Sequence, residues 1–139
     1  MKGWRTAVLL GLAAAIASIA IAQSTGRKVN DVHDFMRVKL EHSKKVLEGL
    51  TTEDLDLVAK NAQAMSLLSQ EATWQVLQTQ EYAHRSQDFR RTADTLTQAA
   101  KKKNLDGAAL AYVELTMKCI DCHKYVRDQR QSDAKAKDK

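Results

Sequence analysis

Proline is absent from the 139-residue chain, and glycine occurs only five times. Proline breaks helices because it lacks an amide hydrogen, and glycine weakens them because it loses the most conformational freedom on folding. Residues that favour helices are abundant instead, chiefly alanine, leucine, lysine, glutamate and glutamine. The composition therefore favours helices, and no segment has the pattern of a strand or of a second domain.

Aromatic residues make up only 5% of the chain, and 22 Lys+Arg stand against 17 Asp+Glu. A nucleic-acid surface combines clustered cations with aromatic side chains that stack on bases. Here the aromatics are scattered, and basic runs such as Lys101-Lys102-Lys103 stand where helix ends are expected. The sequence gives no reason to expect a nucleic-acid partner.

One long apolar run occurs, from Ala7 to Ala22, and Lys2 and Arg5 precede it. It is shorter than the roughly 20 residues that a helix needs to span a bilayer. Ala20-Ile21-Ala22 fits the small-x-small pattern of a signal-peptide cleavage site. We therefore expect residues 1–22 to be a secretory signal peptide and the mature chain to be periplasmic, with an uncleaved membrane anchor as the alternative.

Apolar residues then recur at three- and four-residue spacing in four stretches, near residues 30–50, 51–68, 81–102 and 106–127. This spacing predicts amphipathic helices, and a threonine of Thr51-Thr52 is expected to cap the second. Residues 70–80, which include Trp74, are the least regular stretch and are expected to form the longest connection. Four such helices with short connections predict an all-α fold, an antiparallel four-helix bundle.

The last eleven residues, 129–139, are charged and contain no apolar residue larger than alanine. Such a segment has too little apolar surface to pack against a core. We expect a disordered charged tail there and one folded domain over residues 23–128, a size common for a single domain.

The chain has only two cysteines, and both lie in the segment Cys119-Ile120-Asp121-Cys122-His123. This is Cys-x-x-Cys-His, the attachment sequence for a covalently bound c-type haem. On a helix the two cysteines share a face, so both thiols can form thioethers with the haem vinyl groups. The adjacent imidazole can bind the iron. We expect one haem c, attached through Cys119 and Cys122, with His123 as axial ligand.

Three other interpretations of the motif stay open. A thioredoxin-like redox dithiol would need a βαβ pattern, which the sequence does not have. A structural zinc site would need four ligands, and the other histidines are distant in sequence. A simple disulfide would leave His123 without a role. Export to an oxidising compartment agrees with haem attachment.

The motif lies near the end of the last expected helix, and Lys124-Tyr125-Val126-Arg127 follows it. With Phe35-Met36-Arg37 on the first helix, this arrangement resembles the cytochrome c′ family, the class II cytochromes c. The resemblance covers most of the mature chain as architecture, and it is specific over Cys119 to Arg127. One difference is that Tyr125 stands two residues after the histidine, where the family usually has its aromatic three residues after.

The resemblance implies a haem held between the first and last helices of the bundle. His123 would be the proximal ligand, partly exposed, with Arg127 near the proximal side or a propionate. Arg37 would point toward a propionate or an acidic neighbour. A first-helix residue would lie over the distal face, either Met36 as sixth ligand or Leu40 covering an open distal pocket.

Other side chains on these helices are less suited to the distal face. Lys39, His33 and His42 are weaker ligand candidates, and His84 is expected on the surface. The apolar face of the first helix is expected to comprise Val32, Phe35, Met36, Leu40, Ser43, Val46, Leu47 and Leu50.

The sixth iron position decides the expected function. In the family, a methionine ligand goes with electron transfer, and an empty position goes with binding of nitric oxide or carbon monoxide. We expect a monohaem cytochrome that exchanges single electrons with redox partner proteins, and a five-coordinate gas-binding protein is the alternative. An enzyme is not expected, since a peroxidase would need His33 or His42 as its distal acid–base group. Family members often dimerise through their first two helices, which leaves a homodimer open.

Overall fold

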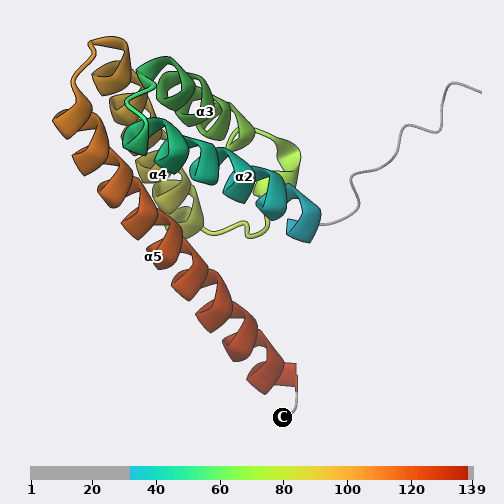
Figure 1. The fold of residues 1–139 in the computed structure, drawn as a ribbon. Helices are drawn as coiled ribbons and strands as arrows, with labels where there is room; N and C mark the ends of the chain where they lie inside the picture. The colour runs from blue at the N-terminus through green and yellow to red at the C-terminus, as the bar shows by residue number, and fades with distance from the viewer. Residues whose placement is uncertain (1–31, 138–139) are drawn as a thin grey trace, which may run out of the picture. The chain divides into compact units, whose positions relative to one another are not determined.

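The computed structural model describes residues 32–137, so the expected signal peptide over residues 1–22 lies outside the described part. The elements are α2 (Val32–Thr51), α3 (Leu55–Leu68), the short 3₁₀ helix η1 (Ala72–Trp74), α4 (Gln80–Lys101) and α5 (Leu105–Lys137) (Figure 1). No strand occurs in residues 32–137. The predicted all-α fold is confirmed, and the long helices agree with a helical bundle. No helix of this region is long and apolar enough to span a membrane.

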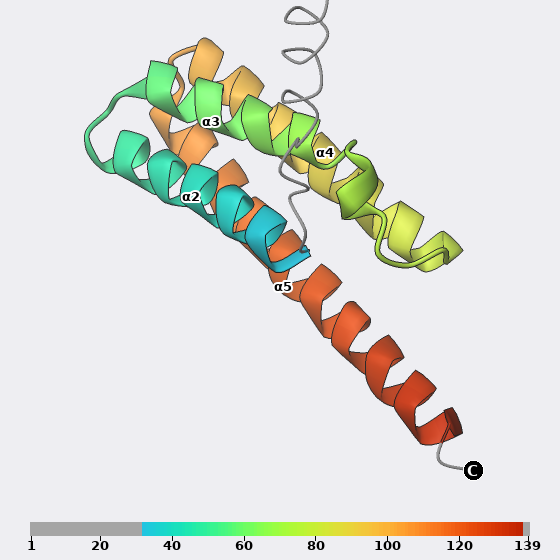
Figure 2. The ribbon, with the colours of Figure 1, turned by 90° about the vertical axis from the view of Figure 1, so that its right-hand side faces the viewer.

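Consecutive long helices run in opposite directions and pack side by side, α2 on α3, α3 on α4 and α4 on α5 (Figures 1 and 2). The first and last of these, α2 and α5, contact each other at far fewer places. One of those places is the pair Ser43 Oγ and Tyr112 Oη, 3.2 Å apart. The backbones of α2 and α5 are therefore less closely packed against each other than those of consecutive long helices.

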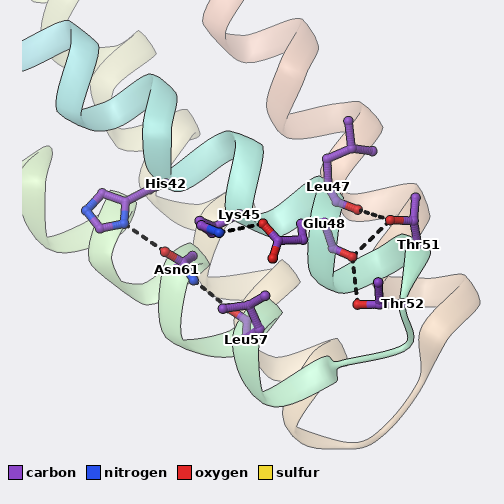
Figure 3. A network of polar contacts seen from close by, with 8 residues as sticks. All are labelled: His42, Lys45, Leu47, Glu48, Thr51, Thr52, Leu57 and Asn61. Carbon is purple, nitrogen blue, oxygen red and sulfur yellow. Dashed lines mark hydrogen bonds and ion pairs between the residues drawn. The ribbon is translucent and has the colours of Figure 1, made fainter.

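The break between α2 and α3 differs from the expectation of a threonine cap. Asp54 caps α3, and its Oδ1 accepts a hydrogen bond from the Leu57 amide at 2.9 Å. The Thr51 and Thr52 hydroxyls instead donate to the Glu48 carbonyl oxygen at the end of α2, both at 2.9 Å (Figure 3). The predicted cap is wrong, because both threonine hydroxyls donate to the preceding helix and Asp54 accepts the amide hydrogen bond at the start of α3.

The last helix is longer than expected. Residues 129–137, which were expected to be disordered, continue α5 as far as Lys137. No proline or glycine interrupts them, and alanine, lysine, arginine and glutamine all have good helix propensity. These residues stay almost entirely exposed. The helical conformation of these residues therefore comes from their own helix propensity and not from packing against the bundle. It continues α5 beyond the Cys-x-x-Cys-His motif.

Gly49 provides a test of the close contact between α2 and α3. A Cβ atom at this buried position would lie 2.8 Å from both the Asp54 carbonyl oxygen and Val58 Cγ2. We expect Gly49→Ala to lower the free energy of unfolding by about 1–3 kcal/mol through overpacking, although alanine is the better helix former. Urea unfolding followed by far-UV circular dichroism measures the change.

The matched control is Glu48→Ala, at the exposed neighbouring position. It removes only a surface ion pair with Lys45, so its effect should stay within about 0.5 kcal/mol. A Gly49→Ala protein as stable as the control would show that α2 and α3 do not approach this closely.

Candidate functional site

The Cys-x-x-Cys-His motif lies on α5, with both cysteines on the face that packs against the core. The buried residues Ala108, Ala111 and Leu115 lead at helical spacing to Cys119 and Cys122. Both cysteines are half-buried, carry free thiols and pack against the hydrophobic core. The small alanines let the first part of α5 lie close to the bundle. The same face then presents both sulfur atoms to the space beside α2.

Two cavities lie between α2 and α5. The first has a volume of about 190 Å³ and includes Cys122 in its lining, and the second has a volume of about 290 Å³ and includes Cys119. Both are lined by Met36 and Lys39 of α2 and by His123 of α5. The two cysteines and the histidine of the motif therefore open onto one region, whose opposite wall is α2.

The two cavities differ in character, and neither has an acidic residue in its lining. Three cationic side chains line the first, those of Lys39, Arg127 and Arg130. The second is mainly apolar, and its polar side chains besides Lys39 and His123 are the hydroxyls of Ser43, Tyr112 and Thr116. The region therefore joins a largely apolar space to one with a cationic lining.

Lys39 occupies the centre of this region. Its side chain is buried, with only 7% of its surface exposed, and its Nζ lies 3.9 Å from the ring centroids of both Trp74 and Phe89. Burial lowers the pKa of Lys39 to about 8, while the charges of Cys119 and Cys122 act in the opposite direction. Aromatic faces thus hold the ammonium group where a carboxylate would ordinarily be its partner.

The titration of the motif follows from the same environment. Burial raises the pKa of both cysteine thiols, and the positive charge of Lys39 opposes this. Burial also lowers the pKa of His123, and Lys39 and Arg127 lower it further. Burial disfavours the charged form of all three groups, and the neighbouring cations add to this effect at His123 but oppose it at the cysteines. The imidazole is therefore held toward its neutral form, which is the form that binds metals.

The residues predicted to lie near the haem differ in their burial and in which of the two cavities they line. Met36 is half-buried and lines both cavities. Leu40 lines only the second cavity and is 54% exposed, whereas Lys39 is buried in its place. Arg127 lines the first cavity, whereas Arg37 is exposed and lines neither.

None of the other histidines lines either cavity. His42 points to α3, where its Nδ1 lies 2.9 Å from Asn61 Oδ1 (Figure 3). His33 Nδ1 lies 3.5 Å from Asp34 Oδ1, and His84 Nε2 lies 3.7 Å from Asp88 Oδ2.

Sequence reasoning missed one residue of the site and ranked a second one low. Arg130 fell in the expected tail, but the continued helix places it two turns after His123, on the same side as Arg127. Lys39 was ranked below Met36 as a ligand. Its position could have indicated burial, because Lys39 stands four residues after Phe35 and seven before Val46 and so shares a helix face with these two buried residues.

The other interpretations of the motif find little support in residues 32–137. The cysteines are not joined in a disulfide. No group of three or more His, Cys, Asp and Glu side chains gathers in this part of the chain, as a zinc site would need. No strand is present to build a thioredoxin-like unit.

No protein-family model, no curated protein and no solved structure matches the chain.

Proposed function

We propose that this protein is an exported c-type cytochrome that binds one haem covalently between α2 and α5 and transfers single electrons. The observation that carries the proposal is the position of Cys119, Cys122 and His123, which open together onto two adjoining cavities without acidic residues. With the signal peptide proposed for residues 1–22, the place of function is the periplasm.

The cysteines would provide the attachment. Each thiol would add across one haem vinyl group, with its sulfur bonding to one vinyl carbon and its hydrogen passing to the other, so that no group leaves. Cys119 and Cys122 lie three residues apart on one face of α5, so both sulfur atoms can reach the same edge of a porphyrin. Their half-buried positions suit a bond between the protein and an apolar ligand.

The axial ligands would come from the two walls of the region. His123 of α5 lines both cavities and is the proximal ligand in this proposal, and Met36 of α2 lines both and can offer its thioether as the sixth ligand. When bound, the haem supplies one-electron chemistry at its iron, with the electron delivered by one partner protein and removed by another. With both axial positions filled by side chains, the protein acts as a carrier and not as an enzyme.

The cationic end of the first cavity would bind the haem carboxylates. Arg127 and Arg130 stand one and two turns after His123, and no acidic residue lines that cavity. Guanidinium groups match carboxylates in charge and geometry. Arg37 is left out of this role because it is exposed and lines neither cavity.

The direct test uses the mature protein produced in a host that attaches haem c. We expect the haem to stay with the protein in acidified acetone and its reduced spectrum to show sharp, split visible bands that carbon monoxide does not move. Haem released into the solvent would overturn covalent attachment. Broad bands that move with carbon monoxide would overturn the six-coordinate electron carrier.

That second outcome would support gas binding, which one observation favours. The second cavity is largely apolar and is bordered by the half-exposed Leu40. Such a space beside an open iron position would admit nitric oxide or carbon monoxide, with Leu40 as its cover.

Met36→Ala distinguishes these two functions. If the thioether binds the iron, its removal should convert low-spin haem to high-spin haem almost completely and allow carbon monoxide to bind. Absorption spectra of the reduced variant with and without carbon monoxide measure the change. The control is Leu40→Ala, four residues on and half-exposed, which should keep the low-spin bands. An unchanged spectrum in Met36→Ala would remove Met36 from the ligand set.

A further inference from the structure

Lys39 is the one charged side chain that is buried in residues 32–137. Its Nζ lies over the faces of Trp74 and Phe89, at 3.9 Å from each ring centroid. No carboxylate of the described residues forms an ion pair with it. Every other lysine that the structure describes is at least partly exposed.

A buried ammonium group without an anionic partner destabilises a fold, because its lost hydration exceeds what aromatic faces return. A leucine or methionine at the same position would fill the space without that cost. Packing alone therefore does not account for a lysine at position 39. A charge kept at such a cost points to a use for the charge itself.

The position of this charge indicates its use. Lys39 lines both cavities together with His123, and it acts on the pKa values of Cys119, Cys122 and His123. A ligand attached at these residues would lie beside the ammonium group in a region of low dielectric. Charges interact most strongly there, because water does not screen them.

We propose that the ammonium group of Lys39 raises the reduction potential of the haem, a role that rests on the proposed cytochrome function. Reduction removes one unit of positive charge from the site when a donor protein delivers its electron. A fixed positive charge nearby therefore stabilises the reduced state relative to the oxidised state. Lys39 acts through space, without binding the iron.

The test compares haem-loaded variants by spectroelectrochemical titration at pH 6, below the pKa of about 8, so that Lys39 carries its charge. Lys39→Gln removes the charge and should shift the midpoint potential to more negative values. Lys39→Arg retains the charge and should stay closer to the wild type. The control is Lys60→Gln, an exposed lysine on α3, which should leave the potential unchanged.

Lys39→Leu is a second neutral variant, in case glutamine is not tolerated in the buried position, and it should shift the potential in the same direction. A neutral variant with the potential of the Lys60→Gln control would overturn the proposal. Loss of the low-spin bands in a neutral variant would also overturn it, because Lys39 would then be an iron ligand.

Failure of the cytochrome function itself is recognised separately. A wild-type chain without covalent haem after acid–acetone extraction would overturn both proposals. An unshifted potential in a haem-loaded variant would overturn only the role of Lys39.

Discussion

Replacing Cys119 and Cys122 together with alanine should abolish covalent haem attachment and leave a folded helical protein. They are the only cysteines of the chain, so no other thiol can form a thioether. Alanine is the best helix former, and it already occupies the same face of α5 at Ala108 and Ala111. The mass of the intact protein, with and without the added mass of one haem, measures attachment, and far-UV circular dichroism checks the fold.

Single variants make this test sharper. Cys119→Ala or Cys122→Ala should each leave one thioether, so haem stays with the chain in reduced yield. Ile120→Ala is the control inside the motif, because this side chain is 41% exposed and carries no thiol. A double variant that still carries the mass of a haem would contradict the assignment, since attachment would then use another residue.

Local features of the fold could be predicted from the sequence. The apolar spacing located the long helices to within a few residues, except for the C-terminal end of α5, because helical periodicity and its interruptions can be read from each segment alone. It also placed Cys119 and Cys122 on one face of the last helix, since a spacing of three fixes their angle around the axis. The Cys-x-x-Cys-His motif could be recognised from its own residues, without information on the neighbouring helices.

The rotation of α2 could not be predicted in the same way. Leu40 and Leu47 were expected on the apolar face, but they are 54% and 50% exposed, and Lys39 is buried instead. An exposed leucine costs little, and a lysine has a long apolar stem that packs well. The choice between neighbouring faces is made by contacts with α3 and with Trp74, which lie far along the chain.

Arg130 was missed for a related reason. The charged end of α5 has no apolar periodicity, so the pattern gave no helix there, although its helix propensity is good. A helix predicted from apolar periodicity is expected to end where its buried residues end, even when the exposed residues that follow are also helical. The continued helix adds a second arginine to the first cavity, and the proposed binding of both haem carboxylates depends on it.

Trp74 lies in the connection that was expected to be irregular, and it is 1% exposed and contacts several elements of the core. Its indole Nε1 donates to Ser86 Oγ of α4 at 2.8 Å, and its carbonyl oxygen accepts from the Tyr82 hydroxyl. Its ring lies 5.2 Å from that of Phe89 and 6.4 Å from that of Phe35, between centroids. One residue of the connection thus holds α2 and α4 together.

Trp74→Ala should lower the free energy of unfolding by about 3–5 kcal/mol, the range for large aromatic side chains removed from a core. Ser86→Ala is the matched control, because it removes only the acceptor of the indole hydrogen bond and should cost about 1–3 kcal/mol. Urea unfolding followed by far-UV circular dichroism compares them. A Trp74→Ala loss no larger than the control's would mean that the ring is not part of the core. The ring also lines the first cavity and supports the Lys39 ammonium group, so its removal should disturb the proposed haem site together with the fold.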